Sequence, residues 1–248
     1  MPNWCDNSMR LHHEDKTKID ALEAEMSKKN ADGHSMAQPF QHLHPNPTGE
    51  WEYDWSVSNW GTKWDANIID WSRDDDNELT IYCDTAWGPP IALYDYLVQN
   101  GWNVEALYHE PGMGFAGIYS NGNDDCHEYD VSDKDSIDNL PSDIVEFAGL
   151  ENSHREWMIS ELESNWGDAE RTDWISAETP PIRDGWYEVS TTGWEFAHFM
   201  EFSNDSWDCY DPKDVIKWRG LTEMGYLSDM PMLDGEEMQA QESIDSQA

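Results

Sequence analysis

The segment Leu79-Thr80-Ile81-Tyr82-Cys83 carries the clearest strand signal in the chain, because it combines β-branched, aromatic and other apolar side chains. An acidic loop precedes it, and the breakers Gly88-Pro89-Pro90 follow it. The two prolines suit the first turn of a helix whose apolar positions are Ile91, Leu93, Tyr94, Leu97 and Val98. Asn100-Gly101 is a typical end for that helix. The sequence therefore predicts a buried strand followed by a helix that packs on it.

Strand and helix signals continue on both sides of this unit. Downstream, residues 104–109 and 114–119 are predicted strands joined by a turn at Glu110-Pro111-Gly112. Upstream, residues 7–13 are a short predicted strand, and residues 16–30 have the apolar spacing of an amphipathic helix. Alternating strands and helices with antiparallel hairpins predict an α+β fold, and more specifically a ferredoxin-like α/β sandwich.

The remaining segments divide the chain into predicted parts. Residues 39–71 are rich in Pro, His and Trp and are predicted to be a long Trp-rich insertion or loop without helix. Residues 143–167 are predicted helix with a core stripe, and three short aromatic strands are predicted at 186–189, 194–199 and 215–218. The predicted division is a ferredoxin-like domain (1–133), an acidic linker and helix (134–170), a small Trp-rich antiparallel β domain (171–226) and a disordered acidic tail (227–248).

The charge of the chain excludes several classes of partner. Its 248 residues hold 52 acidic and 14 basic side chains, a formal net charge of −38 that is spread through both halves. Such a charge makes direct contact with nucleic acid or an anionic membrane unfavourable. The 15 Trp residues supply enough apolar surface for folded cores, which argues against simple disorder. The four cysteines are widely spaced, and the sequence shows no apolar run long enough to span a bilayer and no signal-like segment. These features predict a cytoplasmic location.

Three explanations for the acidity remain open at this point. One is adaptation to a saline host, and another is mimicry of DNA phosphates toward the basic cleft of a DNA-binding enzyme. The third is divalent cation binding, which is weakened because Cys126 stands where a calcium loop needs glycine. The candidate acidic surface residues are Asp74, Asp75, Asp76, Asp124, Asp125, Glu128 and Asp130.

Five ordered motifs resemble those of the YubB-type ferredoxin-like domain, a family of bacteriophages and conjugative plasmids. They are Met1-Pro2-Asn3-Trp4-Cys5 with Asn7, Phe40 and Leu43 before Pro45, residues 59–65, Thr85-Ala86-Trp87 with Pro89-Pro90, and Tyr108 with Glu110-Pro111-Gly112, Phe115 and Gly117. The resemblance covers about residues 1–120. It implies the ferredoxin-like fold and a mobile-element setting, but it brings no assigned activity.

A second, shorter resemblance covers residues 174 to about 221. Its motifs are Trp174-Ile175, Pro180-Pro181, residues 184–187, His198-Phe199 and Lys217-Trp218. They are similar to a small Trp-rich domain of unknown function that recurs in phage genomes, although Arg219-Gly220 departs from its usual ending. This resemblance also implies a phage or plasmid accessory protein and names no reaction.

Motifs that carry catalysis or bind cofactors are weak in this chain. The glycines of Gly112-x-Gly114-x-x-Gly117 match a dinucleotide fingerprint in form, but we interpret them as a hairpin because no helix is expected after them. Pro2 is interpreted as the beginning of the first strand. His42-x-His44 and Cys126-His127 lack the spacing of a metal site. We therefore predict no catalytic residues, no metal and no cofactor.

The best candidate for a ligand site is polar. Lys63 and Asp65 stand beside Trp60 and Trp64 and suggest an ion pair flanked by aromatic rings. Together with Asn3, Thr85 and Glu110, they are predicted either to form a polar pocket at one edge of the sheet or to be a structural network that fixes the long loop.

The leading functional prediction is a non-enzymatic phage or plasmid accessory protein that binds a basic host macromolecule. A defence, restriction or transcription protein whose DNA-binding cleft accepts a DNA mimic is the expected partner, with no direct contact to nucleic acid or membrane. The alternatives are a small-ligand module or enzyme built on Lys63, Asp65 and Glu110, and an accessory protein whose acidity reflects a saline host.

Overall fold

The computed structural model of this protein describes residues 3–166, 171–192, 196–208 and 214–220. The chain divides into two compact units, Met1–His154 and Arg155–Ala248. Both contain antiparallel sheet, and the chain as a whole mixes helix and strand, which confirms the predicted α+β class. Among the described helices, none combines the length and apolar character needed to cross a bilayer.

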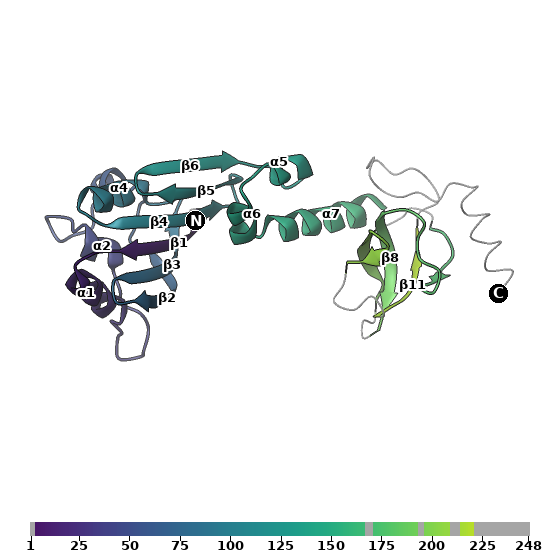
Figure 1. Cartoon of the computed structure of the whole chain (residues 1–248), viewed down its shortest axis with the longest axis horizontal. Coiled ribbons are helices and arrows are strands. Elements are labelled where there is room, and N and C mark those ends of the chain that lie inside the picture. Colours follow the sequence, from purple (N-terminus) through teal and green to yellow (C-terminus); the bar gives the residue numbers. More distant parts are fainter. Residues whose placement is uncertain (1–2, 167–170, 193–195, 209–213, 221–248) are drawn as a thin grey trace. The chain divides into compact units, whose positions relative to one another are not determined.

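The first unit is built on a six-stranded antiparallel sheet (Figure 1). In sheet order the strands run β2-β3-β1-β4-β5-β6. Their bounds are β1 Trp4–His12, β2 Asn67–Asp75, β3 Glu78–Ala86, β4 Asn103–Glu110, β5 Phe115–Ser120 and β6 Asn123–Glu128. The central strand β1 pairs with β3 on one side and β4 on the other, so it holds residues that are distant in sequence together.

Alternation along β1 decides which face of this sheet is covered. Met9 and Leu11 are fully buried, whereas Ser8 and Arg10, which alternate with them, are not. The buried residues pack against α1 (Lys16–Met26) through Ile19 and Leu22, and against α4 (Ile91–Gln99). Two short helices, α2 (Pro39–Leu43) and α3 (Tyr53–Asn59), complete this layer through Phe40 and partly buried Trp55. We call this the covered face.

The opposite face of the sheet, which we call the open face, carries the alternate side chains. From β1 these are Asp6, Ser8, Arg10 and His12, and their cross-strand partners on β3 are Asp84, Tyr82, Thr80 and Glu78. Helix α6 (Ser142–Ala148) contacts β4 and β5. It follows the short helix α5 (Lys134–Asp138), and Gly149 separates it from α7 (Leu150–Trp166) with a left-handed φ of 61°.

Most predicted elements of the first unit are present. The segment 79–83 lies inside β3, and the predicted strand–turn–strand at 104–119 is the hairpin of β4 and β5. The predicted helices around residues 16–30 and 91–98 are α1 and α4. The glycines at 112, 114 and 117 belong to that β4–β5 hairpin, as interpreted.

The insertion at 39–71 was predicted wrongly, because it contains α2, α3 and the first part of β2. Helix α2 has no cap from its neighbours in sequence; instead Asp65 accepts the N–H groups of Phe40 and Gln41 at 3.0 and 2.9 Å. A cap supplied from so far along the chain leaves no local start signal. The acidic segments around Asp74 and at 123–128 are also strands, β2 and β6, held by pairing with β3 and β5.

The second unit contains a five-stranded antiparallel sheet in the order β10-β9-β8-β11-β7. The bounds are β7 Ile175–Ser176, β8 Gly185–Thr191, β9 His198–Ser203, β10 Ser206–Trp207 and β11 Val215–Arg219. Its core joins Tyr187, Trp207 and Trp218 in edge-to-face contacts. The predicted strands at 186–189 and 215–218 are confirmed. The third begins only at His198, and Trp194 and the tail 227–248 lie outside the described residues.

Candidate functional site on the open face of the sheet

The five residues of the predicted polar pocket fall into separate networks. Asp65 caps α2 and also accepts the N–H of Ala66 at 2.8 Å. Burial raises the pKa of the Asp65 carboxyl to about 6, although the three backbone N–H donors oppose this rise. The predicted ion pair with Lys63 is not formed: the Lys63 Nζ atom lies over the rings of Trp64 and Trp87, 4.4 and 5.4 Å from their centroids.

Glu110 and Asn3 meet at the turn between β4 and β5. Glu110 is 1% exposed and accepts the N–H groups of Gly112 and Met113 at 3.1 and 2.6 Å. A Cβ at position 112 would stand 2.7 Å from Asn3 Nδ2 and 2.9 Å from Glu110 Oε1, so only glycine leaves room for both. Glu110 therefore stabilises a tight turn.

Thr85 belongs to a third network, inside the covered face. Its hydroxyl accepts a hydrogen bond from Asn7 Nδ2 at 2.8 Å and donates to the carbonyl of Gly88 at 2.8 Å. The structure thus brings Asn3 and Glu110 together, while Lys63, Asp65 and Thr85 have other partners.

The acidic candidates lie at several places around the sheet. Asp74 and Asp125 belong to the open face, where Asp74 accepts from Thr80 at 2.6 Å and Asp125 pairs across strands with Ile118. Asp124 instead accepts the Tyr108 hydroxyl at 2.7 Å. Glu128 is exposed at the end of β6, and Asp130 forms a turn by accepting the N–H of Ser132.

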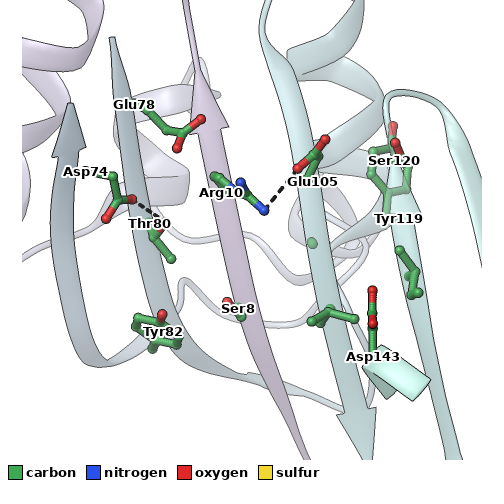
Figure 2. Close-up of a pocket in the computed structure, with 13 residues that line it drawn as sticks. Ser8, Arg10, Asp74, Glu78, Thr80, Tyr82, Glu105, Tyr119, Ser120 and Asp143 are labelled. Atoms are coloured by element: carbon green, nitrogen blue, oxygen red, sulfur yellow. Dashed lines mark hydrogen bonds and ion pairs between the residues drawn. The ribbon is translucent and has the colours of Figure 1, made fainter. Parts of the chain in front are cut away.

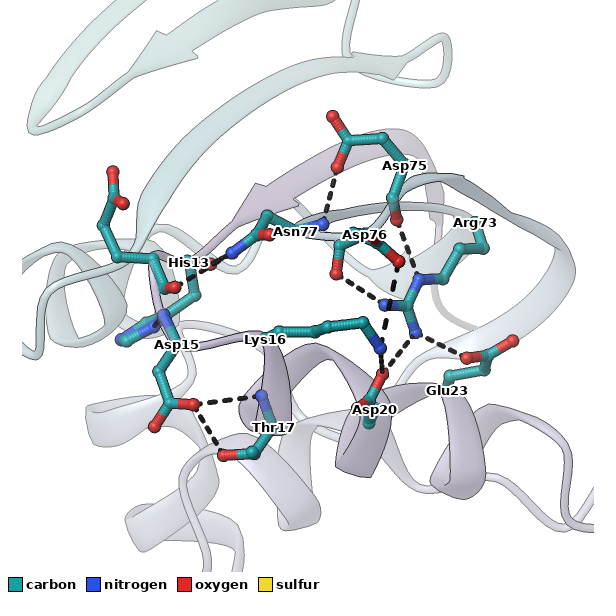
Figure 3. A network of polar contacts seen from close by, with 11 residues as sticks. His13, Asp15, Lys16, Thr17, Asp20, Glu23, Arg73, Asp75, Asp76 and Asn77 are labelled. Atoms are coloured by element: carbon teal, nitrogen blue, oxygen red, sulfur yellow. Dashed lines mark hydrogen bonds and ion pairs between the residues drawn. The ribbon is translucent and has the colours of Figure 1, made fainter.

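The remaining two, Asp75 and Asp76, help to fix the β2–β3 turn to α1 (Figure 3). Arg73 donates to the carbonyl oxygens of both and also to the carboxylates of Asp20 and Glu23, at 2.9 and 2.5 Å. Lys16 lies 3.9 Å from the Asp76 carboxylate. Asp75 and Asp76 therefore have two cations beside them, Arg73 and Lys16, and are part of the fold.

The open face contains a cavity of about 490 Å³ (Figure 2). Four carboxylates line it, from Asp74, Glu78, Glu105 and Asp143, together with the hydroxyl groups of Ser8, Thr80, Tyr82 and Ser120. Arg10 is the one formal cation among its described lining residues, and its guanidinium lies 3.2 Å from the Glu105 carboxylate. The cavity therefore has an excess of negative charge and many hydrogen-bond acceptors.

Next to this cavity, Asp6 and Asp84 stand directly opposite each other on β1 and β3. Burial raises the pKa of the Asp6 carboxyl, and the neighbouring Asp84 raises it further through a shared hydrogen bond and charge repulsion. His109 Nδ1 lies 3.9 Å from Asp6, but burial lowers the pKa of this histidine and disfavours its charged form. Like charges opposite each other destabilise a sheet, so this pair favours the approach of a cation.

Several other candidates for chemistry are scattered. His44 stacks on Tyr96 with ring centroids 3.6 Å apart, His42 lies 3.8 Å from Glu25, and His127 lies 3.3 Å from Asp125. Within the described part of the chain, no group of three or more His, Cys, Asp or Glu side chains is placed to hold a metal ion. Cys5 and Cys83 are buried free thiols, and burial raises the pKa of each.

No family model matches the chain, and no curated protein matches it either. A crystal structure of the protein api92 from Yersinia pseudotuberculosis, of the DUF1281 family, is similar in part. The two chains share 20% identity over 46% of this chain and 54% of that chain, with a TM-score of 0.30. The chain thus matches about half the length of that protein.

The cavity residues Ser8, Arg10, Glu78, Thr80, Glu105 and Asp143 were not predicted as site residues. A usable signal existed in β1, where polar residues at 6, 8, 10 and 12 alternate with Cys5, Asn7, Met9 and Leu11. Period-two alternation indicates a strand with one solvated face. The strands on either side of β1 had to be known before the other lining residues could be placed with it.

Proposed function

We propose that this protein is a non-enzymatic binding protein whose open face takes a basic segment of a partner protein. The observation that carries the proposal is the cavity of about 490 Å³ in which four carboxylates face one guanidinium. Arg10 is already compensated by Glu105 at 3.2 Å, so the other three carboxylates remain to attract a cation.

The net charge of the whole chain also supports a basic partner. A net charge of −38 attracts basic proteins over a long range and repels nucleic acid and anionic lipid. The Asp6–Asp84 pair adds two carboxylates on the open face, and the described residues provide no charged partner for them, since His109 favours its neutral form. A lysine or arginine side chain on the partner would relieve this repulsion.

For the partner, we propose a nucleic-acid-binding enzyme of a host cell, toward which the acidic surface acts as a DNA mimic. Support comes from the sequence resemblance to phage and plasmid families. The ferredoxin-like assignment is part of the same proposal. It is supported by the sheet order β2-β3-β1-β4, with α1 after β1 and α4 between β3 and β4.

Binding of a labelled arginine-rich peptide, measured by fluorescence anisotropy, tests the proposal. The double variant Glu78→Gln/Asp143→Asn removes two cavity carboxylates, and we expect it to weaken binding by roughly fivefold. The matched control Glu14→Gln/Asp32→Asn changes the net charge equally at exposed positions away from the cavity. We expect the control to bind nearly as well as the unmodified protein, and binding to weaken as salt is added.

Two results would contradict the proposal. Equal loss in both double variants would mean that the peptide responds only to net charge, as expected for a protein whose acidity is an adaptation to salt. If the peptide does not bind at low ionic strength, the proposal of a basic partner is contradicted.

A further inference from the structure

A second cavity, of about 330 Å³, lies within the insertion between α2 and β2 and is independent of the open face. Three indoles, of Trp51, Trp60 and Trp64, form part of its lining. Its polar lining includes Asn46, Ser56 and Asp65, each from a different segment of the insertion. Aromatic walls with a few converging polar groups are typical of small-molecule sites.

The amide of Asn46 has an unused donor. Its Oδ1 atom accepts both the N–H and the hydroxyl of Thr48 at 3.0 Å, which fixes the orientation of the amide. The Nδ2 atom then has no hydrogen-bond partner among the described residues, although Asn46 is only 4% exposed. A buried donor without a partner is unfavourable, so a bound acceptor would stabilise the site.

Ser56 has the same property on the opposite segment, helix α3. Its hydroxyl makes no hydrogen bond within the described residues, and the residue is 1% exposed. A hydroxyl group both donates and accepts, so it can pair with either kind of group on a ligand. Two orphaned polar groups lining one cavity are unusual, because buried polar groups are nearly always paired.

Asp65 and Trp51 supply the other two elements of a binding site. Asp65 Oδ2 accepts one hydrogen bond, from Gln41, and a carboxylate oxygen has room for a second. The Trp51 indole is fixed because its Nε1 donates to the Lys63 carbonyl at 2.9 Å, yet the residue is 56% exposed. An immobilised and exposed indole offers a flat apolar surface to a ligand.

We propose that this cavity binds a neutral saccharide ring. Sugar hydroxyl groups point outward all around a ring, which suits polar partners that stand on three different segments of the chain. The C–H faces of the ring pack on indole faces. A nucleobase instead presents its polar atoms along its edges in one plane, and an anionic ligand is disfavoured by Asp65 and by the net charge of the chain.

Saturation-transfer NMR and calorimetry of the full chain test this inference. The saccharide probes are methyl β-D-glucopyranoside, methyl β-D-galactopyranoside, N-acetyl-D-glucosamine and cellobiose, and the competing probes are adenosine and uridine. Ser56→Ala is expected to lower saccharide affinity by roughly five- to tenfold without lowering the thermal midpoint, because the hydroxyl has no partner to lose. Trp51→Ala is expected to lower affinity as well.

The matched controls lie outside the cavity. Ser58→Ala changes an exposed serine of the same helix, and Tyr82→Ala removes an exposed aromatic ring of the open face. Neither should alter saccharide binding. The inference is overturned if none of the four saccharides binds, if a nucleoside binds in their place, or if Ser56→Ala leaves the affinity unchanged. None of these results bears on peptide binding by the open face.

Discussion

The two faces of the six-stranded sheet differ in whether their polar side chains have favourable partners. On the covered face, Asn7 is 3% exposed and its amide donates to Thr85 at 2.8 Å. On the open face, its neighbour Asp6 has a carboxylate beside it and a histidine that favours the neutral form. Residues adjacent in sequence thus differ in role, because alternation directs one into a satisfied network and the other toward solvent. The polar groups of Asn7 and Thr85 are paired with each other, whereas the facing carboxylates of Asp6 and Asp84 have no cationic partner among the described residues.

The largest effect is expected from overpacking at Gly117, where β5 crosses the buried ring of Tyr108. A Cβ at this position would overlap the Tyr108 phenol and stand 2.7 Å from the Asp125 carbonyl oxygen. Because Tyr108 is 1% exposed and its hydroxyl is held by Asp124, it has nowhere to move without losing contacts. We expect Gly117→Ala to lower the free energy of unfolding by about 3 kcal/mol, measured by urea denaturation.

The alanine control for that experiment is Gly122→Ala, at a turn with open space around the added Cβ but a φ of 98°. It should cost about 1 kcal/mol through backbone strain alone. If Gly117→Ala costs no more than this control, the close contact with Tyr108 is contradicted.

The next largest effect separates two glutamates of the same strand, β4. Glu110→Gln exchanges one acceptor oxygen for an amide that cannot pair with a second N–H, so one buried donor at the turn loses its partner. We expect a loss of about 2 kcal/mol. Glu105→Gln on the open face affects only an exposed pair with Arg10 and should change stability by less than ~0.5 kcal/mol. Equal losses for the two variants, measured by chemical denaturation, would break the contrast between the faces.

The distance in sequence between interacting residues explains which parts of the molecule were predictable from sequence. The segment 79–83 and the 104–119 hairpin were predicted correctly because their apolar patterns and turn residues are local signals. Helix α2 and strand β6 were missed because each depends on a distant partner, Asp65 for the helix and β5 for the strand. Charge runs such as 123–128 resemble loops when their strand partner is unknown.

The candidate sites show the same limit. Asp65 was identified from its aromatic neighbours, but its role as a distant helix cap depends on how the insertion folds. The orphaned Asn46 and Ser56 were not identified, since an unpaired buried donor has no signature in composition or spacing. The open-face cavity needed the registers of β1, β3, β4 and β5 together.

A smaller loss is expected for Asp65→Asn. The asparagine oxygen accepts on one side only, so at least one N–H of the α2 cap would be left without a partner. We expect a loss of about 1.5 kcal/mol in thermal or chemical unfolding. The folded-state pKa of Asp65 is raised to about 6, so in the native protein this group contributes stability that is lost as pH rises from about 4 through 6. The variant should lose that component of the pH dependence, and an unchanged pH profile would contradict the raised pKa.

The smallest change is expected at Asp6, and it should have the opposite sign. Replacing one of two facing carboxylates by an amide removes repulsion across β1 and β3, so Asp6→Asn should raise stability at neutral pH by about 0.5 kcal/mol. Because the folded-state pKa of Asp6 is raised above 3.8, the native protein gains stability at this site in acid and loses it as pH rises through the folded value. The gain in the variant should therefore shrink as the pH is lowered toward 4. Destabilisation by Asp6→Asn at neutral pH would mean that this carboxylate is a structural group like those of the covered face, and the open face would then lose its distinguishing property.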